Sequence, residues 1–433
     1  MAILSRDLIR TIRADFGTPA YVYDQRALEQ AAAEVLAFPS AFGLTARYAM
    51  KALPTAAIVR LLADTGLHID ASSGFEVERT LAIGVAPERI QLTAQELPRD
   101  LKQLVEGGVL FNACSLHQLD AYGRLFPGKP VSVRINPGLG SGHNNRTNVG
   151  GPASAFGIWH ERLDEVLALQ REYDLRLTGM HTHIGSGSDP ETWKHCARLS
   201  LEIAARLPDV ERLSLGGGMK VARMPGESAT DLQEIGRAVQ PDFEAFAERH
   251  GRRLHLEIEP GTYLVARAGV ILASVIDVVD TLPAAGALPA AGALPAAGAG
   301  PTGYRFIKTD TGMTEFLRPN LYGSQHPIEV VPMDGEPRGE DDYVVVGHCC
   351  ESGDMMTPAA GDPETLEPRR LARPVIGDAL LIGGSGAYCS GLAGKNYNSF
   401  PEAPEILIDR DGQPRLIRAR QTLAQLTANE ILD

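Results

Sequence analysis

The sequence predicts a (β/α)8 TIM barrel followed by a β-rich domain, and two observations lead to this fold class. From residue 25 to residue 262, short apolar runs typical of buried strands alternate with amphipathic stretches of helical period. Eight such strands, each followed by a helix, are the number that closes an α/β barrel. An open, doubly wound sheet is the alternative, because periodicity does not show whether a sheet closes. Beyond residue 262, strand-like runs follow one another across turn residues, which is typical of a β-barrel or sandwich.

The individual elements follow from the same patterns. In the predicted barrel, residues 25–262, we expect strands at 47–51, 68–71, 90–92, 109–112, 131–136, 177–184, 212–215 and 254–258, with helices among them at 55–65, 74–83, 164–173, 192–207 and 242–250. In the predicted β-rich domain, residues 263–433, we expect strands at 263–279, 305–309, 328–332, 343–347, 379–382 and 405–408. Residues 1–24 are expected to join this second domain, because residues 20–23 alternate as a strand that can pair with it.

Composition and charge argue against several classes of function. The 433 residues are 44% hydrophobic and 22% charged, which is ordinary for a globular protein with a large core. The formal net charge of -13 argues against binding to nucleic acid or to an anionic membrane surface. The longest uncharged run, residues 281–304, carries three tandem copies of Leu-Pro-Ala-Ala-Gly-Ala at 282–299, so we expect a flexible loop there and no membrane span.

The cysteines and the N-terminus indicate a cytoplasmic protein. The five cysteines are sparse, odd in number and without the CxxC spacing of zinc sites, so we expect reduced thiols and no metal. Residues 1–17 have the period of a short amphipathic helix with charges every few residues, unlike a secretory signal.

Two polar stretches end the first and sixth barrel strands, and active sites of such barrels lie at strand carboxyl ends. Lys51 closes the apolar strand 47–51, where loss of hydration favours a free amine that can form a Schiff base with a carbonyl cofactor such as pyridoxal phosphate. His181 and His183 face the same way if both lie on a strand, but no third metal ligand stands nearby. We therefore expect one imidazole to pack against an aromatic ring, with the turn at Ser186 offering donors to an anion.

Two further stretches end the seventh and eighth strands. Gly216, Gly217 and Gly218 allow backbone N–H groups to approach a phosphate closely. Glu259, in the run Glu257–Gly261, is an acid at the barrel mouth that needs a partner, and a protonated pyridine nitrogen is suitable. By alternation, Glu257 is expected to face outward or to be paired in the core.

The second domain contributes three polar constellations. They are Arg318-Pro319-Asn320-Leu321-Tyr322, Cys349-Cys350-Glu351-Ser352-Gly353-Asp354 and Gly386-Ala387-Tyr388. Each could be a surface turn, but together they supply a cation, a carboxylate, a thiol and a phenol. Such a set could hold a polar amino acid and deliver a proton.

Taken together, these motifs resemble those of the pyridoxal-phosphate-dependent decarboxylases of the alanine-racemase-like fold, and among them the diaminopimelate decarboxylases. The resemblance covers nearly the whole chain, from residues 18–24 to residues 396–398. The motifs stand in the family order: Tyr-Ala-Met-Lys, His-Ile-Gly-Ser-Gly, Gly-Gly-Gly, Glu-Pro-Gly, Arg-Pro-x-Leu-Tyr, Cys-Glu-Ser-Gly-Asp and Gly-Ala-Tyr.

The resemblance implies the cofactor pyridoxal 5'-phosphate and the decarboxylation of meso-2,6-diaminopimelate to L-lysine and carbon dioxide, the last step of lysine biosynthesis. It also implies a homodimer whose active sites are shared across the interface. Catalytic roles are implied for Lys51 and Cys350. Cofactor-binding roles are implied for Lys51, His183, Ser186, Gly216, Gly217, Gly218, Glu259, Gly261 and Tyr388, and substrate-binding roles for Arg318, Tyr322, Glu351 and Tyr388.

The implied roles differ in kind. Lys51 would hold the cofactor covalently, His183 would stack on its ring and Glu259 would pair with the ring nitrogen. Cys350 and Glu351 would reach into the other subunit's site, where Cys350 donates a proton and Glu351 contacts the distal amino group. Arg318 and Tyr322 would bind the distal carboxylate.

One position departs from the family pattern and leaves the substrate open. Thr262 follows Glu-Pro-Gly where the family usually has arginine, and a hydroxyl cannot supply a positive charge or a bidentate contact. The alternative is a decarboxylase of another basic amino acid, such as D-lysine, D- or L-ornithine or a carboxy-polyamine. Against this alternative, Arg318 supplies the cation that a second carboxylate needs. An amino-acid racemase and a non-catalytic pyridoxal-phosphate-binding protein are less favoured, because the Cys350-Glu351 motif and Lys51 are both present.

Overall fold

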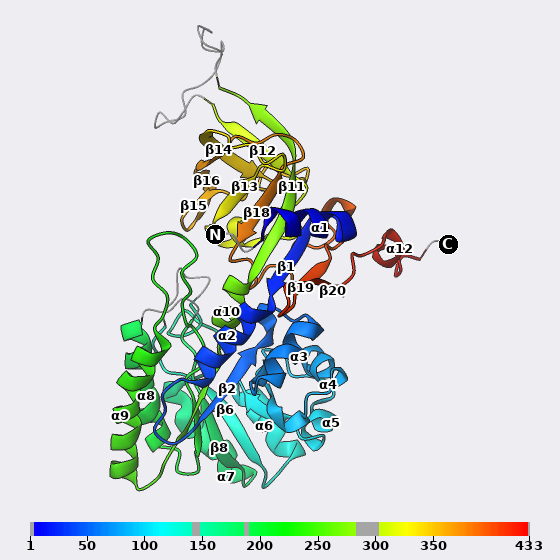
Figure 1. Ribbon diagram of the computed structural model, residues 1–433. Helices are drawn as coiled ribbons and strands as arrows, with labels where there is room; N and C mark the ends of the chain where they lie inside the picture. Colours follow the sequence, from blue (N-terminus) through cyan, green and yellow to red (C-terminus); the bar gives the residue numbers. More distant parts are fainter. Residues whose placement is uncertain (1–3, 141–147, 186–189, 283–302, 432–433) are drawn as a thin grey trace, which may run out of the picture. The chain divides into compact units, whose positions relative to one another are not determined.

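The structure is a computed structural model that describes residues 4–140, 148–185, 190–282 and 303–431 (Figure 1). The repeat at 282–299 lies outside these residues, apart from Leu282. The chain forms two compact units, of which one is Arg26–Ala266 and the other combines Met1–Gln25 with Arg267–Asp433.

The unit Arg26–Ala266 is a closed barrel of parallel strands. Around the barrel these are β2 (Leu44–Ala49), β3 (His68–Ala71), β4 (Ile90–Leu92), β5 (Leu110–Ala113), β6 (Pro130–Asn136), β8 (Arg176–His181), β9 (Arg212–Ser214) and β10 (His255–Ile258). The barrel closes because β10 pairs with β2, with Leu256 opposite Leu44. The predicted TIM-like barrel is therefore confirmed, and the open sheet is excluded. A short strand, β7 (Ile158–Trp159), pairs with the end of β6.

Helices connect the barrel strands and lie around them (Figure 1). They are α2 (Gln25–Leu36), α3 (Ala56–Asp64), α4 (Gly74–Ala82), α5 (Leu101–Glu106), α6 (Leu116–Leu125), α7 (Leu163–Glu172), α8 (Pro190–Ala205), α9 (Leu232–His250) and the short α10 (Thr262–Val265). Side-chain caps fix several starts: Ser73 accepts from the Glu76 N–H, and Asp231 accepts from the first turn of α9. The helix expected at 242–250 begins at Leu232 instead, because Pro241 lies inside α9 and does not end it.

Two predicted barrel strands end two or more residues earlier than expected, and both ends lie at the carboxyl end of the barrel. The strand expected at 47–51 ends at Ala49, and the chain turns into the 3-10 helix Met50–Ala52. The strand expected at 177–184 ends at His181, so the alternation of side chains does not extend to His183.

The other unit is built on a mixed sheet with the order β17-β14-β12-β11-β1-β19-β20, and β18 pairs with both β11 and β13. Its strands are β1 (Ala20–Asp24), β11 (Gly269–Asp280), β12 (Arg305–Thr309), β13 (Ile328–Val331), β14 (Glu340–Val346), β15 (Pro358–Ala359), β16 (Asp362–Leu366), β17 (Arg369–Ala372), β18 (Ala379–Gly383), β19 (Glu405–Ile408) and β20 (Pro414–Arg418). Its helices are α1 (Arg6–Phe16), α11 (Arg318–Tyr322) and α12 (Leu423–Leu426).

The N-terminal strand lies inside this sheet, as expected for residues 20–23. β1 pairs antiparallel with β11 and parallel with β19. The strand expected at 263–279 begins only at Gly269, because residues 262–265 are helical. A buried apolar cluster that includes Ile9, Ile12, Val22, Leu272 and Ile406 ties α1 to the sheet.

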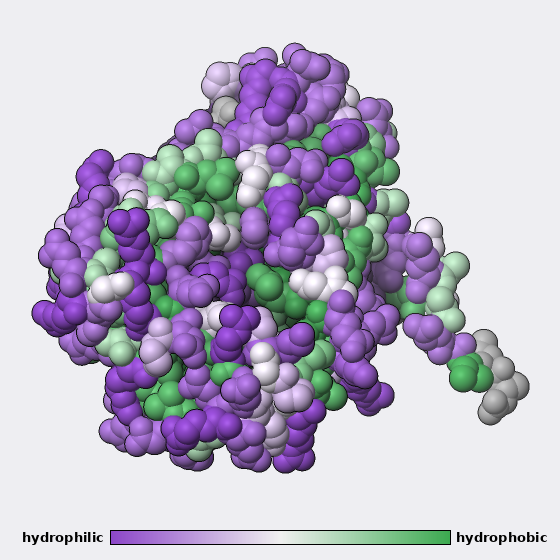
Figure 2. Space-filling view, turned by 90° about the horizontal axis from the view of Figure 1, so that it is seen from below, coloured by the Kyte–Doolittle hydropathy of each residue, from purple (hydrophilic) through white to green (hydrophobic). Residues whose placement is uncertain are grey.

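Within the described residues, no helix is both long and apolar enough to cross a membrane. The face shown in Figure 2 is mainly hydrophilic, with hydrophobic residues in small, scattered groups. This distribution is ordinary for a protein surface exposed to water.

Candidate active site

Main-chain hydrogen bonds join the carboxyl ends of three neighbouring barrel strands. The Ala49 N–H donates to the Pro260 carbonyl at 3.2 Å, which ties the end of β2 to the loop after β10. The Glu259 N–H donates to the Gly216 carbonyl at 2.9 Å, which ties that loop to the glycines after β9. The stretches around Lys51, Gly216 and Glu259 therefore lie together at one end of the barrel.

Lys51 differs from its expected setting. It lies in the 3-10 turn after β2, and its side chain is exposed, whereas the sequence predicted a desolvated lysine within the strand. The turn explains the difference, because Met50 and Ala52 point into the core while Lys51 points away from it. The amine lies at the end of the barrel where the other groups gather, and its charge acts on Asp70 and His183.

Glu259 is buried and held by two short hydrogen bonds. Its Oε2 lies 2.7 Å from Nε2 of His181, and its Oε1 accepts from the Ser214 hydroxyl at 2.9 Å. Burial by itself raises the pKa of the carboxyl, but the interactions with His181, His183 and Ser214 together outweigh burial and lower the pKa to about 2. Glu259 is therefore a carboxylate at any physiological pH.

His183 and the three glycines form the neighbouring wall. The Gly217 N–H donates to Nδ1 of His183 at 3.1 Å, which orients the imidazole. Burial lowers the pKa of His183 well below its ordinary value, and the charges of Arg134 and Lys51 lower it further. His183 is thus a neutral, flat ring.

The glycines are required by close backbone approach. A Cβ on Gly216 would lie 2.6 Å from the His183 imidazole, and a Cβ on Gly217 would lie 2.5 Å from the Glu259 carbonyl. Gly216 also has a φ of +68°, which other residues rarely adopt. The Gly216 N–H already donates to the Ser214 hydroxyl at 3.2 Å, so this N–H has a hydrogen-bond partner within the chain.

Sequence reasoning missed Asp70, the third residue of β3. Its side chain is buried, and its pKa is raised to about 8, first by burial and then by the charge of Glu259. Its Oδ1, like Nδ1 of His181, is a buried atom without a hydrogen-bond partner among the described residues. An acidic residue at a barrel strand end, the signal that identified Glu259, could have identified Asp70 as well.

Glu257 has a structural role. It is buried, and its Oε1 lies 3.0 Å from Arg47 and 3.5 Å from Arg212. The alternative that placed Glu257 as a paired core residue therefore fits the structure. Glu257 lies inside β10, whereas Glu259 lies in the loop directly after this strand.

In the β-rich unit, Arg318 and Tyr322 open and close the short helix α11. The guanidinium of Arg318 lies 5.8 Å from the ring centroid of Tyr322, and its Nε donates to His326 Nε2 at 3.3 Å. Asn320, between them, donates its amide to the carbonyls of Gly353 and Met355. The helix is therefore tied to the loop that follows β14.

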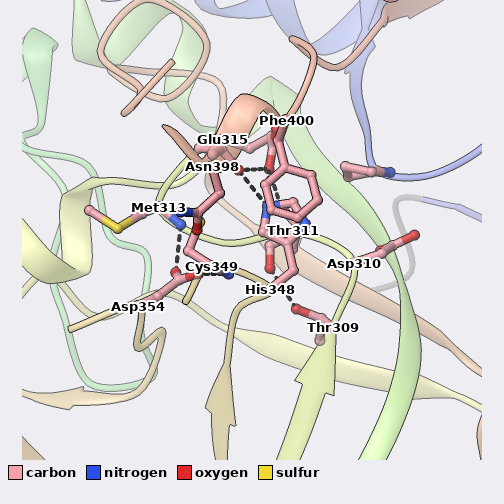
Figure 3. A network of polar contacts seen from close by, with 12 residues as sticks. Thr309, Asp310, Thr311, Met313, Glu315, His348, Cys349, Asp354, Asn398 and Phe400 are labelled. Atoms are coloured by element: carbon pink, nitrogen blue, oxygen red, sulfur yellow. Dashed lines mark hydrogen bonds and ion pairs between the residues drawn. The ribbon is translucent and has the colours of Figure 1, made fainter. Parts of the chain in front are cut away.

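That loop carries Cys350 and Glu351, and both side chains are exposed. Asp354 anchors it, because the buried carboxylate accepts the N–H groups of Cys349 at 2.8 Å and Met313 at 2.6 Å (Figure 3). Arg318, Tyr322 and Glu351 thus belong to two segments that the structure joins.

Tyr388 follows β18 and has a φ of +55°, which is rare for an aromatic residue and typical of functional positions. Gly261 precedes α10, and a Cβ there would lie 3.1 Å from the Ala49 carbonyl. Ser186 lies outside the described residues.

The barrel residues fit pyridoxal 5'-phosphate. Glu259 offers a permanent negative charge to a pyridinium nitrogen, and His183 offers a neutral ring for stacking. The backbone at Gly216 and Gly217 leaves no room for side chains, and Lys51 offers an amine. These four features match the ring, the phosphate and the aldehyde of the cofactor.

The chain matches known proteins over nearly its whole length. Residues 28–266 match the family described as "Pyridoxal-dependent decarboxylase, pyridoxal binding domain". The diaminopimelate decarboxylase of Streptomyces coelicolor is 37% identical, over 96% of this chain and 90% of the relative. A crystal structure of a diaminopimelate decarboxylase has a TM-score of 0.87 at 34% identity and covers 99% of this chain and 97% of that chain.

This chain is also similar to a second crystal structure, which contains a bound amino acid. The diaminopimelate decarboxylase of Helicobacter pylori, complexed with L-lysine, has a TM-score of 0.82 at 25% identity and covers 97% of this chain and 98% of that chain. The chain belongs to the diaminopimelate decarboxylases, within the family of pyridoxal-dependent decarboxylases.

Proposed function

We infer that this chain is a carboxy-lyase that uses pyridoxal 5'-phosphate to convert meso-2,6-diaminopimelate into L-lysine and carbon dioxide. The observation that carries the reaction class is the buried Glu259, whose carboxylate is held by His181 and Ser214 at the barrel end. The substrate follows from relatives that are similar over nearly the full length of both chains and from the L-lysine bound to one of them.

The cofactor supplies the chemistry of the reaction, and the residues of the chain hold the cofactor in position. When bound, pyridoxal phosphate supplies an electron sink that stabilises negative charge on the carbon that loses carbon dioxide. Glu259 would keep the ring nitrogen protonated, and His183 would hold the ring from one side. Lys51 would hold the cofactor covalently, and the backbone of Gly216–Gly218 with Ser186 and Gly261 would bind its phosphate.

Substrate binding and protonation are assigned to the β-rich unit. Arg318 and Tyr322 would bind the distal carboxylate, and Glu351 would bind the distal ammonium. Tyr388 would complete the wall around cofactor and substrate. The Cys350 thiol would donate the proton that replaces the carboxylate.

We propose that the chain works as a homodimer, with Cys350 and Glu351 completing the active site of the other subunit. Their exposure on their own chain supports this arrangement, because exposed residues on an anchored loop can reach a second protein. We also propose a cytoplasmic location, since none of the five cysteines, all of which lie within the described residues, forms a disulfide, as reducing compartments favour.

The test is product analysis with purified protein and pyridoxal phosphate. meso-Diaminopimelate should release L-lysine, while D-lysine and both ornithines should react at least about 100-fold more slowly, as expected when one charged contact is lost. Preferred turnover of a mono-carboxylate would contradict the substrate assignment. It would show that Thr262, half-buried at the start of α10, marks a changed specificity.

A further inference from the structure

The segment 394–400 of the β-rich unit is an unusually constrained turn. Asn396, Asn398 and Ser399 have φ values of 60°, 49° and 61°. Residues other than glycine rarely adopt this left-handed conformation, although asparagine tolerates it better than most. Such a cluster persists only where surrounding contacts hold it.

Both ends of the turn are held by contacts that do not involve the Asn398 side chain. The Gly394 N–H donates to the Met313 carbonyl at 2.9 Å. At the other end, the Phe400 ring stacks on His348, with centroids 3.7 Å apart and planes at 6° (Figure 3). The turn is therefore fixed to the two segments that flank Cys350 in space.

From the middle of this turn, Asn398 reaches the proposed proton donor. Its Oδ1 accepts the main-chain N–H of Cys350 at 2.8 Å. Cys350 is exposed, so water could satisfy this N–H as well, and the bond is not needed to pair a buried donor. What the side chain adds is a fixed position for the backbone of Cys350.

The adjoining residue is fixed from a different direction. Asp354 accepts the Cys349 N–H at 2.8 Å, and Gly312 and Gly347 lie against its carboxylate so closely that a Cβ on either would clash. Asp354 thus fixes the position of the loop. Asn398 fixes the backbone of Cys350, the residue of this loop that carries the thiol.

We propose that Asn398 is a positioning residue of the decarboxylation reaction, which orients the Cys350 thiol by holding its main-chain N–H. The inference rests on the proposed function, in which Cys350 donates a proton to the product carbon. Asn398 acts through the backbone of Cys350, so its removal shifts the donor without removing it. A misplacement of about 1 Å is enough to lower a rate 100-fold.

Two substitutions at this position separate the hydrogen bond from the backbone conformation. Asn398→Gly keeps the left-handed conformation and removes the acceptor, whereas Asn398→Asp tolerates the conformation and keeps an oxygen acceptor. Ser399→Gly, on the same turn, is the matched control for a change of flexibility. We expect Asn398→Gly to lower kcat by about 10- to 100-fold with little change in KM, and the other two variants to stay within about threefold.

A second readout does not depend on activity. Hydrogen–deuterium exchange, followed by mass spectrometry, should be faster in the peptide that contains Cys350 for Asn398→Gly but not for Asn398→Asp or Ser399→Gly. The Tm of all three should stay near that of the wild type, because the turn is held at Gly394 and Phe400.

The outcomes separate the two proposals. An active wild type with unchanged kcat and exchange in Asn398→Gly overturns this inference alone, as does a Cys350→Ala variant with full activity. An equal loss of kcat and Tm in all three turn variants also overturns it, because it indicates a structural role only. A wild type without decarboxylase activity overturns the proposed function and this inference together.

Discussion

Nε2 of His181 lies 2.7 Å from Oε2 of Glu259, and both side chains are buried at the carboxyl end of the barrel. This pair gives the two histidines of the motif different tasks. His181 keeps Glu259 ionised, whereas His183 bonds to the Gly217 N–H and remains a neutral ring. A carboxylate has lone pairs for further donors, so Glu259 can accept hydrogen bonds from His181, Ser214 and a cofactor nitrogen at the same time.

Replacing Glu259 by Gln should lower kcat/KM by about 100-fold, because the amide cannot keep a bound pyridine nitrogen protonated. The measurement is steady-state L-lysine release at saturating pyridoxal phosphate. Glu257→Gln is the matched control, since Glu257 is equally buried two residues earlier but is paired with Arg47. Breaking that pair should lower the Tm while changing kcat by less than about tenfold, since a broken buried pair costs about 3–5 kcal/mol of stability. If both variants lose activity and stability alike, Glu259 has no separate catalytic role.

Lys51→Arg should abolish covalent attachment of the cofactor and lower kcat by at least about 1,000-fold, because a guanidinium is not a nucleophile. Borohydride reduction followed by peptide mass spectrometry should find the cofactor adduct on the peptide that contains Lys51 in the wild type only. Lys102→Arg, on the exposed face of α5, should keep both the adduct and the activity. An adduct that persists in Lys51→Arg would assign the attachment to another lysine.

Asp70 should make the stability of the protein fall with rising pH. Its folded-state pKa of about 8 lies above that of an unfolded aspartate, so the folded state binds more protons between about pH 4 and pH 8. Stability from this group is therefore greatest below pH 4 and declines until about pH 8. Asp70→Asn removes this loss of stability with rising pH. The Tm of the variant minus the Tm of the wild type should therefore be about 2–4 °C larger at pH 8.5 than at pH 5.5.

The control for this effect is Asp411→Asn, which changes an exposed carboxyl. Its Tm relative to wild type should not vary over the same pH range. If the Tm difference between Asp70→Asn and wild type also does not change with pH, Asp70 titrates like an exposed aspartate.

Arg318→Gln should raise KM for meso-diaminopimelate by about 10- to 100-fold, because a hydrogen bond to a charged group contributes about 1.5–3 kcal/mol. The effect on D-lysine, which lacks the distal carboxylate, should be small. Arg370→Gln, at an exposed position of β17, is the matched control and should leave both constants unchanged. Equal losses with both substrates would place Arg318 in structure and not in recognition.

Much of the fold could be predicted because it is recorded in local sequence. The strands β3, β4, β12 and β19 have the expected limits, since each is a short run with buried apolar residues that is flanked by turn or loop residues. Glu259 and Gly216–Gly218 could be predicted as site residues because acids and glycines at the ends of buried strands are unusual. The sequence by itself therefore determined the alternation of strands and helices in residues 25–262, the β-rich character of the rest and the kind of chemistry.

Tertiary structure decided what depends on register and on distant partners. Periodicity cannot show that Leu256 of β10 lies opposite Leu44 of β2, which closes the barrel. Nor does it show that Glu259 is bonded to a histidine 78 residues away, that Lys51 turns outward after Ala49, or that Asn398 holds Cys350. Local sequence sets which face of an element is buried, whereas the partner of a buried polar group is set by which strands and loops the folded chain brings together.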